Sequence, residues 1–345
     1  MGLNSRHSKS RIGLRDVAKI AGVSTATVSR VVNNPDSVSK DLQTRVNMVI
    51  EKTGWIPNAA ARALASKRTG AIGAIFPSLA LGDFANAIDA MQDKLAERNY
   101  LLLLGRSDYK AKLEFDLIKK LTERGVDGLI LVGSTRKEQN KDLLKKISVP
   151  HLSAFVYDEV SDNICVGPDN RKAMSEMVRY LISLGHRRFG LIAQTTENND
   201  RALARLEGVH SELARNSIAI PPSAIVQGKW SIHEGRRLFR QLLSCDQRPT
   251  AVICGNPLLA VGAVLEAERS GIRVPEQMSI VGYDDIEIMS DLPTPITTVR
   301  VDSDKVGRVA ADTIVDMVEG KQGIFGSRIP SEIIIRASSG PPPHS

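Results

Sequence analysis

Leu14-Arg-Asp-Val-Ala-Lys-Ile-Ala-Gly-Val-Ser-Thr-Ala-Thr-Val-Ser-Arg-Val-Val-Asn33 contains two short amphipathic segments that meet at a glycine corner. Apolar residues recur at helical spacing on both sides of Gly22, which predicts helices over residues 16–21 and 25–32. Ser24 or Thr25 is placed to cap the second helix, because a hydroxyl satisfies N–H groups in a first turn. This layout is typical of a helix-turn-helix motif and also of a plain αα-corner within a helical bundle.

The residues after this corner extend the helical pattern. A third helix is predicted over residues 40–53, with Ser39 as its cap. A short helical stretch, 57–65, opens on Pro57, which is tolerated at a first helical position. Residues 66–70 (Ser-Lys-Arg-Thr-Gly) are typical of a domain boundary. The three main helices would share a small core, formed by Val17, Ala18, Ala21, Val23, Val28, Val31, Leu42, Val46 and Val49.

Charge is distributed very unevenly along the 345 residues. Residues 1–70 carry twelve Lys or Arg against four Asp or Glu, whereas the rest carries 34 against 35. A basic end on a neutral body indicates a polyanion-binding segment. A solvated basic tail would lack the periodic apolar pattern with which these positive charges alternate. We therefore expect the first fifth of the chain to bind nucleic acid.

The remaining composition excludes several classes of protein. Cys165, Cys245 and Cys254 show neither disulfide-framework nor CxxC spacing, which indicates a reducing compartment. The basic stretch 1–11 is not followed by the apolar segment of a secretory signal, and no apolar run approaches membrane-spanning length. We expect a cytoplasmic protein, associated with the nucleoid when bound to DNA, with no cofactor, metal or membrane partner.

From Ala71 onward, short apolar runs alternate with amphipathic helices, which predicts parallel sheets covered on both faces. Two such sheets fit the length, since the chain is too long for one ordinary core. The strands are expected over 72–76, 101–104, 128–132, 152–155, 189–193, 251–254 and 279–281. The helices are expected over 84–98, 111–124, 138–146, 170–184, 202–215, 231–244, 258–270 and 303–319. Residues 338–345, rich in Ser and Pro, are expected to form a frayed end.

In a helix-turn-helix motif, the second helix lies in the major groove and its N-terminal side chains reach base edges. Thr25, Ala26 and Arg30 would project there. Arg30 can donate two hydrogen bonds to guanine, whereas Ala26 can touch only a thymine methyl group. Short polar side chains suited to phosphate oxygens accompany them, namely Ser24, Thr27, Ser29 and Asn33.

Residues 14–68 resemble the DNA-binding head of the lactose/galactose-repressor family of bacterial transcription regulators. In the head, the resemblance rests on Asp16-Val-Ala, Ala21-Gly-Val-Ser, Thr27-Val-Ser-Arg-Val-Val-Asn, Val38-Ser, Trp55-Ile-Pro-Asn and Ala63-Leu-Ala. In the body, it rests on Leu184-Gly-His-Arg-Arg, Arg205-Leu-Glu-Gly, Val281-Gly-Tyr-Asp-Asp and Thr297-Thr-Val. The resemblance covers nearly the whole chain, except residues 1–13 and the tail.

This resemblance implies a hinge that enters the minor groove. Leu64 would wedge into the central base step of a two-fold operator, and the bend would bring more protein against DNA. Asn58, Ala61 and Arg62 would flank the wedge. Two hinge helices must pair for this, so a homodimer on a pseudo-palindrome is expected. Taken alone, Leu64 would be interpreted as an ordinary core leucine.

For the body, the resemblance implies a periplasmic-binding-protein-like (type I) α/β domain of two lobes with an effector cleft between them. The expected domains are 1–56 (extension and helix-turn-helix), 57–69 (hinge and linker), 70–340 (effector domain) and 341–345 (tail). Lobe 1 would comprise about 70–168 and 299–328, and lobe 2 about 169–298 and 329–340. The positions that match effector contacts are Phe84, Arg205, Trp230, Asn256 and Asp284. As alternatives, Arg205 could pair ions at the surface, Asp284 could occupy a turn, and the aromatic residues could be core.

Two departures from the family pattern bear on the ligand. Pro257 stands where the family commonly has an acidic hydroxyl acceptor, and Arg201 stands where a small polar residue is usual. One acceptor fewer and one cation more favour a sugar acid or sugar phosphate over a neutral hexose. Asp169-Asn170 is expected to cap the following helix, so neither is included in the cleft.

The sequence therefore predicts a DNA-binding repressor of a carbohydrate-utilisation operon, controlled by a small sugar-like effector. An enzyme is the first rival, but no Walker loop, metal-spaced His/Cys set or GxSxG motif is present, and His186 shows no partner in the sequence. A solute-binding protein without a regulatory role is the second, and the basic head argues against it. An architectural DNA-binding protein is the third, although it would not need 270 residues of α/β structure.

Overall fold

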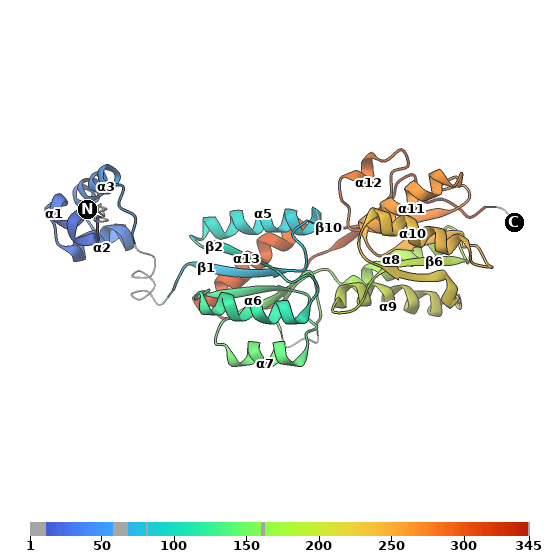
Figure 1. Cartoon of the computed structure of the whole chain (residues 1–345), viewed down its shortest axis with the longest axis horizontal. Coiled ribbons are helices and arrows are strands. Elements are labelled where there is room, and N and C mark those ends of the chain that lie inside the picture. The colour runs from blue at the N-terminus through green and yellow to red at the C-terminus, as the bar shows by residue number, and fades with distance from the viewer. Residues whose placement is uncertain (1–11, 58–67, 81, 160–162, 344–345) are drawn as a thin grey trace, which may run out of the picture. The chain divides into compact units, whose positions relative to one another are not determined.

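The computed structural model describes residues 12–57, 68–80, 82–159 and 163–343. The chain divides into two compact units, Met1–Thr69 and Gly70–Ser345. Figure 1 shows a small all-helical unit and a larger α/β unit built from two sheets. Each unit has its own core.

The first unit contains the three helices predicted from the sequence, α1 (Leu14–Ala21), α2 (Thr25–Asn33) and α3 (Lys40–Thr53). A short 3₁₀ turn over Pro35–Ser37, which the sequence analysis missed, separates α2 from α3. Gly22 ends α1 at φ 65°, a left-handed conformation that glycine adopts without strain. The sharp corner between α1 and α2 therefore depends on this glycine.

The helix caps and the core residues of the first unit agree only in part with those predicted from the sequence. Ser24 Oγ accepts a hydrogen bond from the Thr27 N–H at 3.0 Å and caps α2, as predicted. Ser39 occupies the N-cap position of α3, but its side chain makes no cap hydrogen bond, so the predicted Ser39 cap is wrong. Leu42 is only half-buried, whereas Val38, Ile50 and Trp55 pack against the core of the unit.

The second unit contains two sheets, one in each lobe, confirming the α/β class expected for the body. Lobe 1 has strand order β11-β5-β4-β3-β1-β2, and all of its strand pairs are parallel. Its strands are β1 (Ala71–Phe76), β2 (Leu101–Arg106), β3 (Gly128–Val132), β4 (His151–Ala154), β5 (Cys165–Gly167) and β11 (Ser327–Arg328). Its helices are α5 (Gly82–Glu97), α6 (Ala111–Glu123), α7 (Glu138–Lys146) and α13 (Ser303–Glu319). Helices α5 and α13 pack together on one face of the sheet, and α6 and α7 lie on the other (Figure 1).

Lobe 2 has strand order β12-β10-β9-β8-β6-β7, with only the β10–β12 pair antiparallel among its described strands. Its strands are β6 (Phe189–Gln194), β7 (Ile225–Gly228), β8 (Ala251–Cys254), β9 (Ser279–Tyr283), β10 (Thr297–Val301) and β12 (Ser331–Ile334). Its helices are α8 (Asn170–Ser183), α9 (Asp200–Arg215), α10 (Ile232–Leu243), α11 (Pro257–Arg269) and the short α12 (Ile288–Asp291). Helices α8 and α9 pack as one pair, and α10 and α11 as another.

The chain crosses between the lobes three times. It passes from β5 to α8, returns from β10 to α13, and crosses again from β11 to β12. Strand β10 pairs with β9 and β12 up to Val301, so lobe 2 extends beyond the 298/299 boundary expected from the sequence. The carboxyl ends of the parallel strands in such sheets are where ligand sites form.

The tail differs from expectation. Residues 338–340 are not frayed, because Ser338 is fully buried and its hydroxyl hydrogen-bonds Ile280 O and the Thr297 N–H. Ser339 shares a hydrogen bond with Tyr180, and Gly340 accepts one from Ser279. These bonds fasten the segment after β12 to lobe 2.

No helix within the described residues is both long and apolar enough to cross a membrane.

Candidate nucleic-acid interface and ligand cleft

Helix α2 buries one face and exposes the other. Val28 and Val31 are buried against the small core of the first unit, whereas Thr25, Ala26 and Arg30 are exposed on its opposite side. The three residues predicted to reach base edges therefore lie on one accessible surface. This exposed surface is what a reading helix requires.

The short polar side chains predicted to contact phosphates form local hydrogen bonds. Ser24 Oγ and Thr27 Oγ1 are 2.9 Å apart and share a hydrogen bond. Asn33 Nδ2 donates to Ser29 Oγ at 3.2 Å, one turn apart on α2. These bonds hold the hydroxyl and amide groups at fixed positions along the helix while Ser24 and Asn33 stay exposed.

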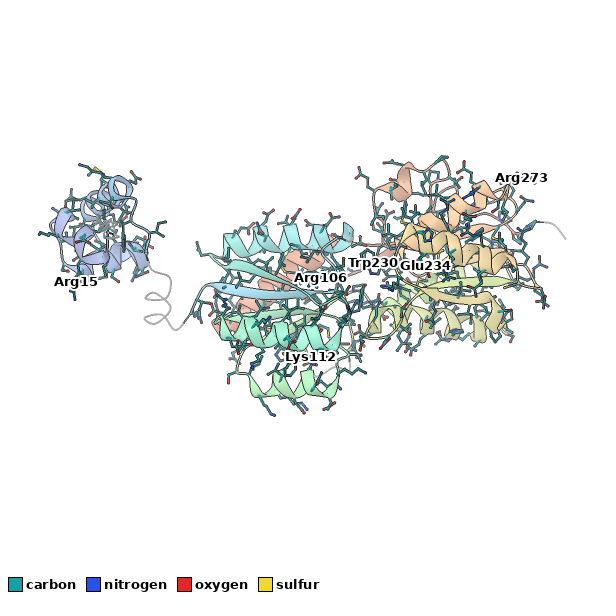
Figure 2. All side chains as sticks on the ribbon, in the orientation of Figure 1. Arg15, Arg106, Lys112, Trp230, Glu234 and Arg273 are labelled. Carbon is teal, nitrogen blue, oxygen red and sulfur yellow. The ribbon has the colours of Figure 1, made fainter. Side chains whose placement is uncertain are left out.

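The basic residues within the range 12–57 are exposed to solvent. No ion pair joins two residues within 12–57, where six Lys or Arg side chains stand against four Asp or Glu. Figure 2 labels one of these residues, Arg15 on α1. The exposed basic side chains of this range are Arg15, Lys19, Arg30, Lys40, Arg45 and Lys52. Such a surface attracts a polyanion through long-range electrostatics.

Four predicted DNA contacts, Asn58, Ala61, Arg62 and Leu64, lie outside the described residues. Their role in a hinge stays a prediction.

In the second unit, a small cavity of about 40 Å³, open to solvent on one side, lies between the two lobes. Four of the five predicted effector contacts, Phe84, Arg205, Asn256 and Asp284, line this cavity, which we call the first chamber. The fifth, Trp230, does not line the first chamber. It follows β7 in lobe 2, is half-buried, and is labelled in Figure 2. Residues that the sequence analysis did not select also line the first chamber, namely Asp83, Tyr109, Phe155, Asn170, Gln194 and Tyr283.

Arg205 is held rigidly at the wall of the first chamber. Its Nη1 donates to Asn170 Oδ1 at 2.9 Å, and its guanidinium lies 4.5 Å from the centre of the Tyr283 ring. The side chain is only 7% exposed, yet its Nε has no hydrogen-bond partner among the described atoms. A buried donor without a partner is costly, so a ligand oxygen at this point would satisfy it. Arg205 is therefore not the surface ion-pair residue of the alternative interpretation.

Asn170 belongs to the cleft, contrary to expectation. Asp169 alone caps α8, by accepting from the Lys172 N–H at 2.9 Å. Asn170 instead accepts from Arg205 and from the Tyr283 hydroxyl, and it donates to Phe155 O. The sequence does not reveal this role, because Asp-Asn before a helix is typical of a cap, and only the folded chain shows that one of the two residues turns inward.

Asp83 and Asp284 place two carboxyl groups together in the first chamber. Asp83 lies in the first turn of α5 and Asp284 directly follows β9. Burial and the neighbouring Asp284 carboxyl raise the pKa of Asp83 to about 9. Burial also raises the pKa of Asp284, against the opposing effect of Arg205. Two carboxyl groups in one buried site retain a proton between them, so this pair can both donate and accept hydrogen bonds.

Amide groups of lobe 2 complete the polar lining. Asn256 Oδ1 caps α11 by accepting from the Leu258 N–H at 3.0 Å, which directs its Nδ2 toward Gln194 Oε1 at 3.5 Å. Gln194 Nε2 donates to the Tyr109 hydroxyl of lobe 1 at 3.1 Å. Pro257 fits its position because proline is tolerated in the first turn of a helix.

Three phenylalanine rings form the apolar wall. Phe84 packs edge-on against Phe76 at 5.5 Å and Phe155 at 4.9 Å between ring centres. Phe84 is 8% exposed, so it contributes to the core and to the chamber at once. Phe84 is therefore both a core residue and a wall of the ligand cavity, the two roles that the sequence left open.

Backbone strain is concentrated at the cleft. Seven non-glycine residues adopt positive φ within the described chain, and Tyr109, Phe155, Asn198 and Asp284 among them line the interlobe cavities. Residues held in this region cost free energy and persist where the surrounding structure requires them. Their clustering marks the cleft as the functional region of the second unit.

Arg201 does not add an unpaired cation to the first chamber. Its Nη1 lies 2.9 Å from Asp200 Oδ1, and both side chains are largely buried. Asp200 in turn accepts from the Ser134 N–H at 2.6 Å and the Thr135 N–H at 3.0 Å, both in lobe 1. Burial opposes ionisation of Asp200, but Arg201 and these N–H groups outweigh it and lower its pKa. We call this contact between α9 and the β3–α7 loop the Asp200 latch.

His186 has a structural environment. Its ring nitrogens hydrogen-bond Thr250 Oγ1 at 2.9 Å, Ser279 Oγ at 3.1 Å and Gly340 O at 2.9 Å. It is fully buried, and burial lowers its pKa. These contacts tie the tail to the sheet of lobe 2. Within the described residues, no group of three His, Cys, Asp or Glu side chains is arranged to hold a metal ion.

Comparison with known proteins finds relatives of both units. The model for bacterial regulatory proteins of the lacI family matches residues 13–58, and the model for periplasmic binding protein-like domains matches residues 178–339. The chain is 31% identical over 338 residues to the HTH-type transcriptional repressor CytR of Escherichia coli K12, covering 98% of this chain and 99% of CytR. It is 32% identical over 316 residues to the HTH-type transcriptional repressor PurR of Escherichia coli O139:H28, covering 90% of this chain and 91% of PurR.

Solved structures show the same architecture. The crystal structure of the lac repressor dimer bound to operator and the anti-inducer ONPF has a TM-score of 0.86 and 29% identity, covering 96% of this chain and 100% of the repressor chain. The complex of the transcriptional regulator CelR with cellobiose has a TM-score of 0.70 and 26% identity, covering 95% of this chain and 100% of the CelR chain. The similarity thus extends over both units.

Proposed function

Because the chain belongs to the lacI family of bacterial regulatory proteins, we propose that it represses a carbohydrate-utilisation operon. In this proposal it binds a pseudo-palindromic operator as a homodimer in the cytoplasm, and a small sugar-like effector in the interlobe cleft controls its DNA affinity. The observation that carries the proposal is the exposed polar surface of α2 in a basic unit that is joined to a body with an interlobe cleft.

The DNA-binding part of the proposal assigns roles along α2. Arg30 would hydrogen-bond a guanine edge, and Thr25 and Ala26 would select neighbouring bases. Ser24, Thr27, Ser29 and Asn33 would contact phosphates and hold the helix in register. The hinge would add Asn58, Ala61 and Arg62 around a Leu64 wedge in the minor groove.

A dimer is supported by an apolar edge in lobe 1. Strand β2 ends the sheet, and Leu101 (64% exposed) and Leu104 (41% exposed) present aliphatic side chains to solvent. Exposed apolar residues on an edge strand favour contact with another chain. The lac repressor structure to which this chain is similar is a dimer bound to operator.

A hydroxyl-rich effector suits the lining of the first chamber. Arg205 offers a donor without a partner, the Asp83–Asp284 pair donates and accepts, and Phe84 offers an apolar face. Such mixed polar and aromatic lining is typical of small-molecule sites. The relatives solved with ONPF and with cellobiose support a sugar-like effector, and the absence of an acidic acceptor at Pro257 favours a sugar acid or sugar phosphate.

Control of DNA affinity would follow from lobe movement. The lobes are joined by the Gln194–Tyr109 hydrogen bond and the Asp200 latch, and both border the cavities. A ligand that binds one lobe arrangement better than another shifts the population of the two. The shift changes the spacing of paired heads and therefore the affinity for a two-fold operator.

A gel shift on DNA upstream of the protein's own gene tests the repressor proposal, using the wild-type chain and Arg30→Ala. The wild type should retard a specific fragment in the presence of excess competitor DNA. Arg30→Ala should lose about 1–3 kcal/mol of specific binding and keep salt-sensitive non-specific binding. Equal discrimination by the two proteins would remove Arg30 from the reading surface, and the absence of any specific fragment would contradict the proposal. A solute-binding protein without a regulatory role would give that second result.

A further inference from the structure

A second cavity adjoins the first chamber. It has a volume of about 220 Å³ and shares Tyr109, Asn199 and Arg201 with the first chamber as a common wall. We call it the second chamber. Its lobe 1 side is formed at the carboxyl ends of β1 and β2 and at the starts of α6 and α7. None of its other lining residues was selected from the sequence.

Two helices begin at the second chamber without a side-chain cap. The N-cap residues of α6 and α7 are Lys110 and Lys137, and no side chain among the described residues caps either helix. Both lysines line the cavity. The first N–H groups of a helix and its dipole together favour a negative charge. Lysine cannot accept from these N–H groups, so both helix starts retain donors for an anion.

Two buried side chains in the same cavity each have one polar atom without a hydrogen bond among the described atoms, while their other polar atoms are bonded. Arg136 has a side chain that is 5% exposed, and its Nε makes no hydrogen bond although Glu114 Oε1 lies 3.2 Å away as an ion pair. Asn140 is fully buried, and its Oδ1 is an acceptor without a partner among the described atoms. Glu114 already gives Arg136 a charge partner, so Asn140 Oδ1 is the atom that calls for a ligand, and a hydroxyl donor would satisfy it.

The two chambers differ in charge. In the second chamber, Glu114 offsets Arg136 and Asp200 offsets Arg201, which leaves Lys110 and Lys137. Lys110 Nζ lies 2.8 Å from Asp108 Oδ2, but this ion pair is exposed and therefore contributes little free energy. In the first chamber, by contrast, the Asp83–Asp284 carboxyl pair lies opposite the cation Arg205, so no positive charge is left over.

We propose that the second chamber binds the anionic group, phosphate or carboxylate, of the effector whose hydroxyl-bearing part occupies the first chamber. The inference rests on the proposed function for the identity of the effector site. It places the preference for an acidic sugar at Lys110, Lys137 and the starts of α6 and α7. Arg201, which suggested an anionic ligand in the sequence, is neutralised by Asp200 and acts as part of the shared wall.

Inorganic phosphate is the first probe, with the full-length protein in a thermal-shift titration against chloride at matched ionic strength. Phosphate should raise the melting temperature of the wild type, and Lys110→Ala/Lys137→Ala should lose most of this increase. Lys112→Ala/Lys141→Ala is the matched control, because these lysines lie on the same helices, outside the cavity, in exposed ion pairs (Lys112 in Figure 2). Equal losses in both double variants would overturn the proposal, as would an unchanged phosphate response in Lys110→Ala/Lys137→Ala.

Calorimetry with a hexose, its 6-phosphate and its acid distinguishes the two sources of the anion. The charged sugar that binds should lose about tenfold in affinity in Lys110→Ala/Lys137→Ala, the loss expected for one charge-assisted hydrogen bond. Affinity for the neutral hexose should stay the same. Stronger binding of the neutral hexose than of both charged sugars to the wild type would overturn the inference.

Operator binding, measured separately by gel shift, keeps this inference distinct from the proposed function. Specific DNA binding with equal phosphate responses in both double variants would overturn the second chamber alone. Loss of the phosphate response only in Lys110→Ala/Lys137→Ala, without any specific operator, would support the chamber while the repressor proposal fails.

Discussion

At the scale of single residues, the cleft is defined by side chains whose usual chemistry is altered by their surroundings. Asp83 and Asp284 are ordinary acids in the sequence, but together they hold a proton in the folded chain. Arg205 is fixed by Asn170 and Tyr283 with one donor left over. Such perturbed groups in a cavity are typical of a binding site.

The Asp83→Asn variant tests the shared proton. The pKa of Asp83 is about 9 in the folded chain against an ordinary value of 3.8, so the folded chain binds this proton more tightly than the unfolded chain does. Wild-type stability therefore falls as pH rises between these values, because the unfolded chain releases a proton that the folded chain keeps. Asp83→Asn should raise the melting temperature at about pH 8, by roughly 2–4 °C per kcal/mol recovered. Near pH 4 the difference should nearly vanish.

Melting curves at both pH values check this prediction, with Asp89→Asn on the exposed side of α5 as the control. A stabilisation by Asp83→Asn that is the same at both pH values would show that the carboxyl pair does not share a proton.

The residues that line the cleft could be predicted from the sequence only where they belong to a family motif. Phe84, Arg205, Asn256 and Asp284 were selected by resemblance, and all four line the first chamber. Asp83, Tyr109 and Gln194 carry no local signal, because their proximity depends on the docking of two lobes whose segments are far apart in sequence. Asn170 was misassigned because the same residue type suits a helix cap.

At the scale of elements, helices were easier to predict than strands. All eight helices expected in the body are present within about two residues of their expected bounds, since their apolar periodicity is long. Strands β5, β7, β10, β11 and β12 were missing from the predicted set. These strands are short, or they contain Thr, Ser and Arg among their paired residues, so no apolar run in the sequence indicates them.

The Asp200 latch is the element-scale feature with the clearest consequence. Asp200 at the start of α9 accepts hydrogen bonds from the loop between β3 and α7. Gly133 in that loop has φ 82°, and a Cβ at this position would collide with the side chains of Asp200 and Arg201. We expect Asp200→Ala to loosen this loop. Hydrogen exchange of the Ser134 and Thr135 amides should become faster, since their acceptor is lost.

Ser231→Ala is the matched control for this measurement, because Ser231 caps α10 by accepting from the Glu234 N–H within lobe 2. Unchanged exchange at Ser134 and Thr135 in Asp200→Ala would show that the latch does not hold the loop.

At the scale of the whole molecule, the chain divides its tasks between its two units. The positive charge lies in the first 70 residues, and the cavities, strained residues and coupled carboxyl groups lie in the second unit. The sequence predicted this division from charge and periodicity. It could not predict that the cleft has two chambers of different charge, because that depends on side chains from both lobes.

Dimerisation through the apolar edge of lobe 1 is a further prediction at this scale. Leu101→Lys/Leu104→Lys should shift the protein toward monomer, because charged side chains on an edge strand oppose association. Sedimentation velocity should show this shift, accompanied by weaker operator binding. Ile288→Lys, at an exposed isoleucine on α12, serves as the control. A variant that stays dimeric would place the interface elsewhere.

The most direct test of the central claim is operator affinity measured by fluorescence anisotropy with and without a ligand that calorimetry has shown to occupy the cleft. Coupling between effector and DNA sites is typically about 1–3 kcal/mol, or roughly 5–150-fold in affinity. We predict a change of about tenfold or more for the wild type, and none for an Arg205→Ala variant that no longer binds the ligand. Unchanged operator affinity at saturating ligand would contradict the account.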